Sequence, residues 1–234
     1  NNELMYESMA AVDAFNADDD VDVIVVSGAG RAFSPGFDLK AAAERNLDSI
    51  DKVRAQMTLQ FDFIMKFWTS PKPTIAALPG PAAGAGLSLA LACDLRYASE
   101  NAILTTAFAR VGFSGDYGGT WFMSRLIGSA KARELYLLSE RVDMVEAERL
   151  GLVNGVFSQE TLMDEVGNIA RRLAQGPTVA YRYMKENLNR AIHGEMGECL
   201  DMEAAHHIHC GQTADHKEAA QAFVDKREPV FHGR

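Results

Sequence analysis

The sequence has little cysteine and lacks an excess of positive charge. Its 234 residues include three cysteines, Cys93, Cys199 and Cys210, which are far apart and form no CxxC pair. A reduced, intracellular compartment therefore fits best, and we expect a cytoplasmic protein. The formal net charge is −9. This balance argues against a nucleic-acid partner, which would need a basic face.

Several sequence signals are also absent. No apolar run approaches the ~18 residues that a membrane span needs, and no signal peptide is visible. Neither GxGxxG nor Gly-Lys-Ser/Thr occurs, so no nucleotide-binding loop is predicted. The chain opens without Met, and we expect it to lack its natural N-terminus.

Hydrophobic residues make up 47% of the chain, enough for a sizeable core. Apolar spacing predicts helices at about 2–15, 49–68 and 85–93, and strands at 21–26, 74–78, 95–98, 103–105 and 153–157. From about Gly118 onward the pattern is mostly helical. This order predicts an α/β core followed by a helical extension, with no linker between independent domains.

Two glycine-bearing loops follow the first two predicted strands, at residues 28–40 and 80–88. Loops after buried strands are where ligands sit in α/β folds, and small residues let a ligand approach backbone N–H groups closely. On their own, these glycines predict tight turns more readily than a binding site.

Taken together, five segments in order resemble the crotonase (enoyl-CoA hydratase/isomerase) family across essentially the whole chain. They are Gly30-Arg31-Ala32-Phe33-Ser34-Pro35-Gly36-Phe37-Asp38-Leu39, residues 80–94, residues 118–134, Ala147-Glu148-Arg149-Leu150-Gly151-Leu152-Val153-Asn154, and residues 223–231. The active-site loop is most similar to that of isomerase-type members that use an aspartate. The family's usual N-terminal strand pair has no counterpart here.

The resemblance implies a spiral of ββα units over residues 1–175 and a C-terminal helical region over 176–234 that mediates trimers. We therefore expect a homotrimer or a dimer of trimers. The implied ligand is an acyl-CoA thioester. CoA would be part of the substrate, so neither a separate cofactor nor a metal is expected.

The family's shared step is stabilisation of a thioester enolate, whose oxygen is negatively charged. Two fixed backbone N–H donors stabilise that charge, and one such donor contributes about 3 kcal/mol. Aligning the motifs implies that these donors are the N–H groups of Phe37 and Ala85. Phe37 is bulkier than the alanine usual there and would narrow the acyl pocket.

Departures from the family pattern bear on the reaction. A hydratase positions water between two glutamates, and the resemblance places these at Ser88 and Phe108, neither of which carries a proton near neutral pH. Asp116 lies nearby, where hydratases of the family often have glycine. It could act as an acid/base, or it could only cap the helix that begins near Gly118, whose dipole would favour the anion.

Other site residues follow from the resemblance. We expect Ser88, Phe108, Tyr117 and Trp121 in the substrate pocket, although aromatic residues at such positions are as often core. The resemblance implies contacts to CoA from Arg31, Asp38, Leu39, Lys40, Phe223 and Lys226, with Lys226 reaching the site of a neighbouring subunit. His206, His207 and His209 are better explained by helix packing than by metal binding.

These observations predict an enzyme that shifts a double bond of an acyl-CoA by proton transfer through Asp116. The alternatives are an enoyl-CoA hydratase-like lyase, a dihydroxynaphthoyl-CoA synthase-like enzyme, and a protein that binds acyl-CoA without catalysis. A carboxylate at the pocket argues against the last, because binding alone does not need one.

Overall fold

Four of the five predicted strands lie side by side in one parallel sheet. The computed structural model describes residues 2–38 and 49–233 of the chain. The sheet has the order β1 (Ile24–Ser27), β2 (Thr74–Leu78), β4 (Leu95–Ser99) and β6 (Gly155–Phe157), with all three pairings parallel. Two short strands, β3 (Ala82–Ala83) and β5 (Leu104–Thr105), pair in a second parallel sheet.

The central strand β2 is buried on both faces, as its continuous apolar sequence predicts. Ala76 and Leu78 belong to the main hydrophobic core. Ile75 and Ala77 point to the other face, where they pack with side chains of α8 (Leu162–Ala174). This double burial makes β2 a rigid support for the loop that follows it.

Two strands differ from their predicted extents. The strand predicted at 21–26 begins at Ile24, and Val25 is 39% exposed. β1 pairs only with β2 within the described sheet, so one of its sides lacks a neighbouring strand. The strand predicted at 153–157 is shorter and begins at Gly155, because Leu152 and Val153 close the turn after the preceding helix.

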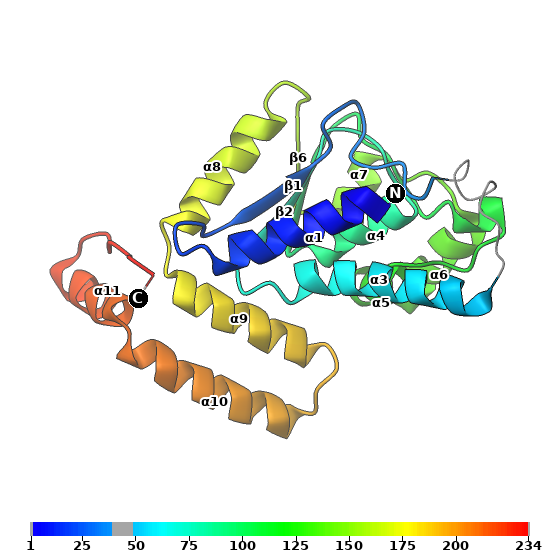
Figure 1. The fold of residues 1–234 in the computed structure, drawn as a ribbon. Coiled ribbons are helices and arrows are strands. Elements are labelled where there is room, and N and C mark those ends of the chain that lie inside the picture. The colour runs from blue at the N-terminus through cyan, green and yellow to red at the C-terminus, as the bar shows by residue number, and fades with distance from the viewer. Residues whose placement is uncertain (1, 39–48, 234) are drawn as a thin grey trace.

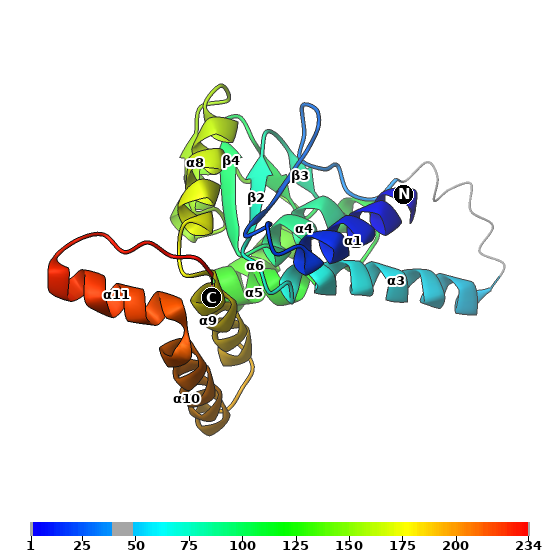
Figure 2. The ribbon, with the colours of Figure 1, turned by 60° about the vertical axis from the view of Figure 1, so that its left-hand side comes forward.

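Helices surround the sheet and then continue away from it (Figure 1). Their bounds are α1 Asn2–Ala17, α3 Ile50–Trp68, α4 Ala85–Ala92, the 3-10 turn η1 Phe108–Val111, α5 Gly119–Ile127, α6 Ser129–Leu138, α7 Met144–Leu150, α9 Thr178–Ala191, α10 Met196–Gln212 and α11 Ala214–Asp225. In both views α10 and α11 project from the α/β body (Figures 1 and 2). None of the described helices is both long enough and apolar enough to cross a bilayer.

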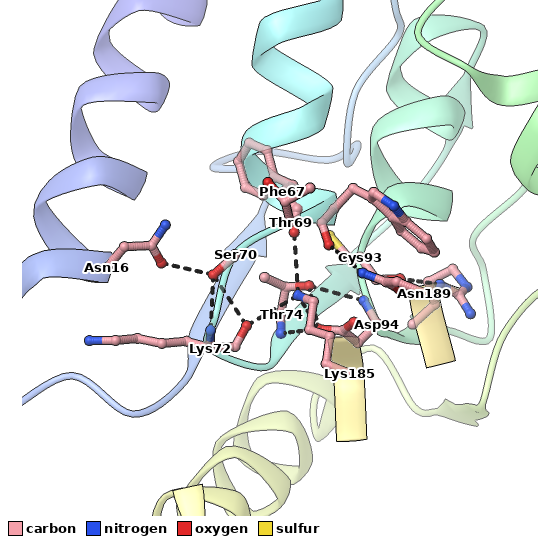
Figure 3. Close-up of polar contacts among 12 residues, drawn as sticks. Asn16, Phe67, Thr69, Ser70, Lys72, Thr74, Cys93, Asp94, Lys185 and Asn189 are labelled. Carbon is pink, nitrogen blue, oxygen red and sulfur yellow. Dashed lines mark hydrogen bonds and ion pairs between the residues drawn. The ribbon is translucent and has the colours of Figure 1, made fainter. Parts of the chain in front are cut away.

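The C-terminal helices are fastened to the core through a buried ion pair (Figure 3). Lys185 on α9 approaches the Asp94 carboxylate at 2.8 Å, and only 8% of its side chain is exposed. The same Asp94 oxygen accepts hydrogen bonds from the Thr74 N–H and hydroxyl at 2.7 and 2.9 Å. One carboxylate therefore joins the start of β2, the end of α4 and α9. The predicted division at residue 175 falls between α8 and α9 and stays a prediction.

Candidate active site

The two glycine-bearing loops meet, as their resemblance to donor loops implies. Ser34 pairs with Ala82 in a parallel bridge, the Ala83 N–H donates to the Ser34 carbonyl at 3.0 Å, and the Phe33 N–H donates to the Pro81 carbonyl at 3.1 Å. Backbone hydrogen bonds thus hold residues 33–34 along the second loop. The segments carrying Phe37 and Ala85 are fixed to one another before any ligand binds.

Gly36 is one of the points at which these loops approach each other closely. It has φ +89°, a conformation that favours glycine, and a Cβ built there would lie 2.6 Å from the Ala83 carbonyl oxygen and 3.3 Å from the Ala85 nitrogen. Any side chain at position 36 would push the loops apart. Glycine is therefore required for Phe37 to follow directly beside the start of α4.

The backbone exposes the Ala85 N–H at the beginning of α4. Gly84 precedes it with φ 52° and ψ −122°, and Ala85 is the first helical residue. N–H groups in the first turn of a helix have no intrahelical acceptor, and they carry the positive end of the helix dipole. Such a group suits a developing oxyanion, which is the chemistry assigned to it from the sequence.

A cavity of about 720 Å³ opens beside the loops. Both expected donors, Phe37 and Ala85, line it together with Asp116 and Phe108. The remaining lining residues are Asn2, Pro35, Ser49, Lys52, Val53, Gln56, Met57, Gln60, Gly84, Thr106, Ala107, Val111, Phe113, Ser114 and Gly115. Most of these are apolar or small, so the cavity can hold an extended apolar group with few polar contacts.

Asp116 lies in the loop between η1 and α5, and its side chain does not cap α5. The N-cap residue of α5 is Gly118, with φ 68° and no side-chain capping bond. The backbone carbonyl of Asp116, rather than its carboxyl, accepts hydrogen bonds from the Gly119 N–H at 3.0 Å and the Ser88 hydroxyl at 3.2 Å. The helix-cap alternative for this side chain is therefore wrong.

The Asp116 carboxyl is half-buried, and one of its oxygens has no partner in the described part of the chain. Its Oδ1 atom is enclosed and has no hydrogen-bond partner among the described residues. Burial raises the pKa of this carboxyl from 3.8 to about 6. The expected effect of the α5 dipole, which favours the anion, is therefore smaller than the opposing effect of the loss of water around the carboxyl.

Ser88 and Phe108 have different surroundings. The Ser88 side chain is 1% exposed and lies outside the cavity lining, where its hydroxyl bonds to the carbonyls of Gly84 and Asp116. The prediction that Ser88 lies in the pocket is therefore wrong. Its hydroxyl instead holds the backbone of the Asp116 loop. Phe108 does line the cavity, and it stacks on Tyr136 with ring centroids 5.9 Å apart.

Tyr117 and Trp121 belong to the core, which corrects the prediction that they line the pocket. Tyr117 has φ 52°, and its buried ring packs against Phe63, with the hydroxyl 3.0 Å from the Met5 sulfur. Trp121 packs edge-on against Trp68 at 5.3 Å. Tyr117 is therefore a core residue, and Trp121 on α5 is half-buried against the core.

Comparisons with known proteins agree with this architecture. The profile of the family described as enoyl-CoA hydratase/isomerase matches residues 1–234. The chain belongs to this family. A probable enoyl-CoA hydratase of Rhodobacter capsulatus is 36% identical over 90% of the chain and 81% of its own length. The 1,2-epoxyphenylacetyl-CoA isomerase of Escherichia coli is 33% identical over 100% of the chain and 90% of its own length.

Solved structures support the fold directly. An enoyl-CoA hydratase from Bacillus anthracis superposes with a TM-score of 0.94 at 31% identity, covering 100% of this chain and 90% of that one. The predicted crotonase-like α/β fold with C-terminal helices is confirmed. Its relatives include proteins named hydratase and isomerase, so membership alone leaves the reaction open.

The residues that the family resemblance assigns to CoA are dispersed. Arg31 and Asp38 are exposed near the first loop, and Leu39 and Lys40 lie outside the described residues. Phe223, 85% exposed, and Lys226 lie at the end of α11. In both views α11 is at the opposite end of the molecule from the first turn of α3, which lines the cavity (Figures 1 and 2). If Phe223 and Lys226 contact CoA, the CoA would therefore have to be bound in the cavity of another subunit.

The C-terminal histidines pack within the helical region. His206 stacks on Tyr183 at 4.3 Å, and its ring nitrogens contact Asn187 at 2.6 Å and Glu186 at 3.2 Å. Within residues 2–38 and 49–233, no group of three or more His, Cys, Asp or Glu side chains is arranged to hold a metal ion.

One wall of the cavity is formed by α3, a contribution that the sequence patterns did not predict. Ser49, Lys52, Val53, Gln56, Met57 and Gln60 all line it. One signal was available: Gln60 stands on the same stripe of the helix as the buried residues Phe63, Ile64 and Phe67. A polar residue on an apolar stripe indicates either a buried hydrogen bond or a ligand contact.

Proposed function

We propose that this protein is an acyl-CoA isomerase that moves a carbon–carbon double bond with Asp116 as its single acid/base. The observation that carries the proposal is the composition of the cavity. Among its described lining residues, Asp116 supplies the only carboxyl group, and no histidine is present. It shares the cavity with Phe37 and Ala85, whose N–H groups are the proposed oxyanion donors.

The proposed reaction conserves every atom of the substrate. Asp116 removes a proton from the carbon next to the thioester carbonyl of a 3-enoyl-CoA. The electron pair moves into the carbonyl, and the two N–H groups stabilise the dienolate oxygen. Asp116 then returns the proton to the fourth carbon, which leaves the double bond between the second and third carbons. No water enters the reaction.

The environment of Asp116 suits a group that takes a proton and returns it. General acid–base catalysis is most efficient when the pKa lies near the working pH. Burial raises the pKa of Asp116 to about 6, so both protonation states are accessible near neutrality. Its Oδ1 atom has no partner among the described residues and is therefore not committed to a structural bond.

The residues that line the cavity support hydration less well than isomerisation. Family resemblance places the two hydratase glutamates at Ser88 and Phe108, and Ser88 is enclosed beneath the Asp116 loop. One carboxyl can shuttle one proton, whereas hydration must also activate a water molecule. Among the relatives, the name isomerase of the Escherichia coli protein supports the proposal, and the name hydratase of the Rhodobacter capsulatus protein supports the alternative.

The test is the Asp116→Asn variant with trans-3-hexenoyl-CoA as substrate, followed by the ultraviolet absorbance of the conjugated product. We expect kcat to fall about 10²–10⁴-fold, the usual contribution of a positioned acid/base. Affinity for the thioester should change little, because the backbone donors remain. The wild type should hydrate crotonyl-CoA far more slowly than it isomerises the 3-enoyl thioester.

Stability provides the control for folding. The pKa of Asp116 is higher in the folded protein than the ordinary value of 3.8, so folding favours the protonated form. This favourable contribution is complete below about pH 4 and is lost as the pH rises through about 6. At neutral pH, Asp116→Asn should therefore melt no lower than the wild type. Full turnover by that variant, or efficient hydration by the wild type, would contradict the proposal.

A further inference from the structure

The α3 wall of the cavity holds a polar side chain that the proposed proton shuttle does not use. Gln60 lines the cavity, and only 5% of the residue is exposed. Its side-chain amide makes no hydrogen bond within the described part of the chain. An amide so deeply buried ordinarily has a partner, because an unpaired one is costly.

The neighbouring amide on the same wall is already occupied. Gln56 exchanges two hydrogen bonds with Asn2, at 2.7 and 2.8 Å. Both lie at the cavity surface, so their side chains satisfy one another whether or not a ligand is bound. Gln60, one helical turn further along α3, has no such protein partner. Its amide is therefore available to a ligand in the cavity that Gln60 lines.

An acyl chain entering this cavity displaces water from the Gln60 amide. Apolar side chains line the same cavity, among them Val53 and Met57 on α3 and Phe108 of η1. A plain hydrocarbon chain would remove water from the Gln60 amide without offering it a hydrogen-bond partner. The unpaired amide would weaken binding of that chain. A chain that carries an oxygen atom at this point would replace the lost water.

Resting on the proposed function, we propose that Gln60 recognises an oxygen atom of the acyl group other than the thioester carbonyl. The substrates are then hydroxylated or otherwise oxygenated acyl-CoA thioesters rather than plain alkenoyl ones. A site that hydrogen-bonds a substrate hydroxyl discriminates strongly against the analogue that lacks it.

The experiment uses pairs of trans-3-enoyl-CoA thioesters. One member of each pair carries a hydroxyl on the fifth, sixth or seventh carbon, and the other carries a methyl group in its place. For at least one pair, we expect the wild-type kcat/KM to favour the hydroxyl member about tenfold or more. Gln60→Met, of similar shape, should abolish the preference. Gln56→Met removes an amide that is already paired and should retain it.

The proposal is overturned if the wild type shows no preference in any pair, or if the preference survives in Gln60→Met. Gln60→Leu replaces that variant if it lacks a cooperative thermal transition. If no 3-enoyl thioester is isomerised at all, the proposed function fails, but calorimetry on the same pairs still tests Gln60. Equal wild-type affinities for both members of every pair would then exclude the recognition of oxygen.

Discussion

At the scale of single residues, the site depends on one carboxyl that titrates in an accessible pH range. Burial raises the pKa of Asp116 to about 6, and the proposed base must be ionised to take the first proton. We therefore expect kcat/KM for a 3-enoyl thioester to fall as the pH decreases through about 6, since kcat/KM reports the free enzyme. Initial rates across a buffer series at constant ionic strength measure this.

The residual activity of Asp116→Asn provides the control for this profile. It should lack the acidic limb, because the titrating group has been removed. A wild-type profile that is flat between about pH 5 and about 8 would mean that Asp116 is not the base in the rate-determining step.

Residue identities could be predicted from the sequence better than side-chain directions. Asp116 was placed at the site by the family resemblance together with the absence of the two hydratase glutamates, since the local sequence alone is equally typical of a helix cap. Tyr117 and Trp121 were misplaced because aromatic composition does not reveal which way a side chain points, and Tyr117 has a left-handed backbone conformation that its sequence does not predict. Gln60 was missed because the register that brings α3 against the cavity depends on tertiary packing.

At the scale of elements, the longer helices and the central strand follow from their apolar periodicity. The predicted helix at 49–68 is observed as Ile50–Trp68, and the predicted strand at 74–78 agrees fully. The two-residue strand β3 and the turn η1 escaped prediction. Such short elements form because the bridge to Ser34 and the neighbouring strand β5 stabilise them, and local sequence carries no periodic signal over two residues.

The junction between α9 and the core leads to a prediction about stability. Lys185 donates to the Asp94 carboxylate at 2.8 Å and to the Lys72 carbonyl at 3.2 Å, with its side chain almost fully buried. Lys185→Met would leave Asp94 without its cation. Breaking a buried pair in this way costs about 3–5 kcal/mol, and we expect that loss in the free energy of unfolding by urea titration.

An exposed ion pair supplies the matched control. Lys66 contacts Asp13 at 2.5 Å, but both side chains are substantially open to solvent. Lys66→Met should therefore cost no more than about 1 kcal/mol. Equal losses for the two variants would show that α9 is not held by the Lys185 contact.

At the scale of the whole molecule, the family resemblance supplied what local patterns could not. Strand order and the close approach of residues 34–37 to Ala85 involve contacts between distant segments. The crotonase-like arrangement was therefore expected from matching motifs rather than from periodicity. The resemblance also predicts trimers, and this assembly stays a prediction.

The C-terminal helices carry apolar surface that one chain leaves uncovered. α10 has 17 residues, and none of them is buried. Met196, Leu200 and Ile208 on this helix are 73%, 52% and 60% exposed, and Phe223 on α11 is 85% exposed. Large apolar side chains gathered on projecting helices are typical of surfaces that contact another protein. A second and a third copy of the chain would be expected to cover this apolar surface.

We therefore expect a trimer or a dimer of trimers in sedimentation equilibrium at micromolar concentration. Leu200→Glu and Ile208→Glu should each shift the distribution towards smaller species, because a charge in an apolar interface loses its hydration without gaining a partner. Val145→Glu, on α7 at a side chain 82% exposed, introduces the same charge away from these helices and should leave the assembly unchanged. A monomeric wild type at every concentration would remove the support for assembly, and also for any role of Phe223 and Lys226 in a neighbouring site.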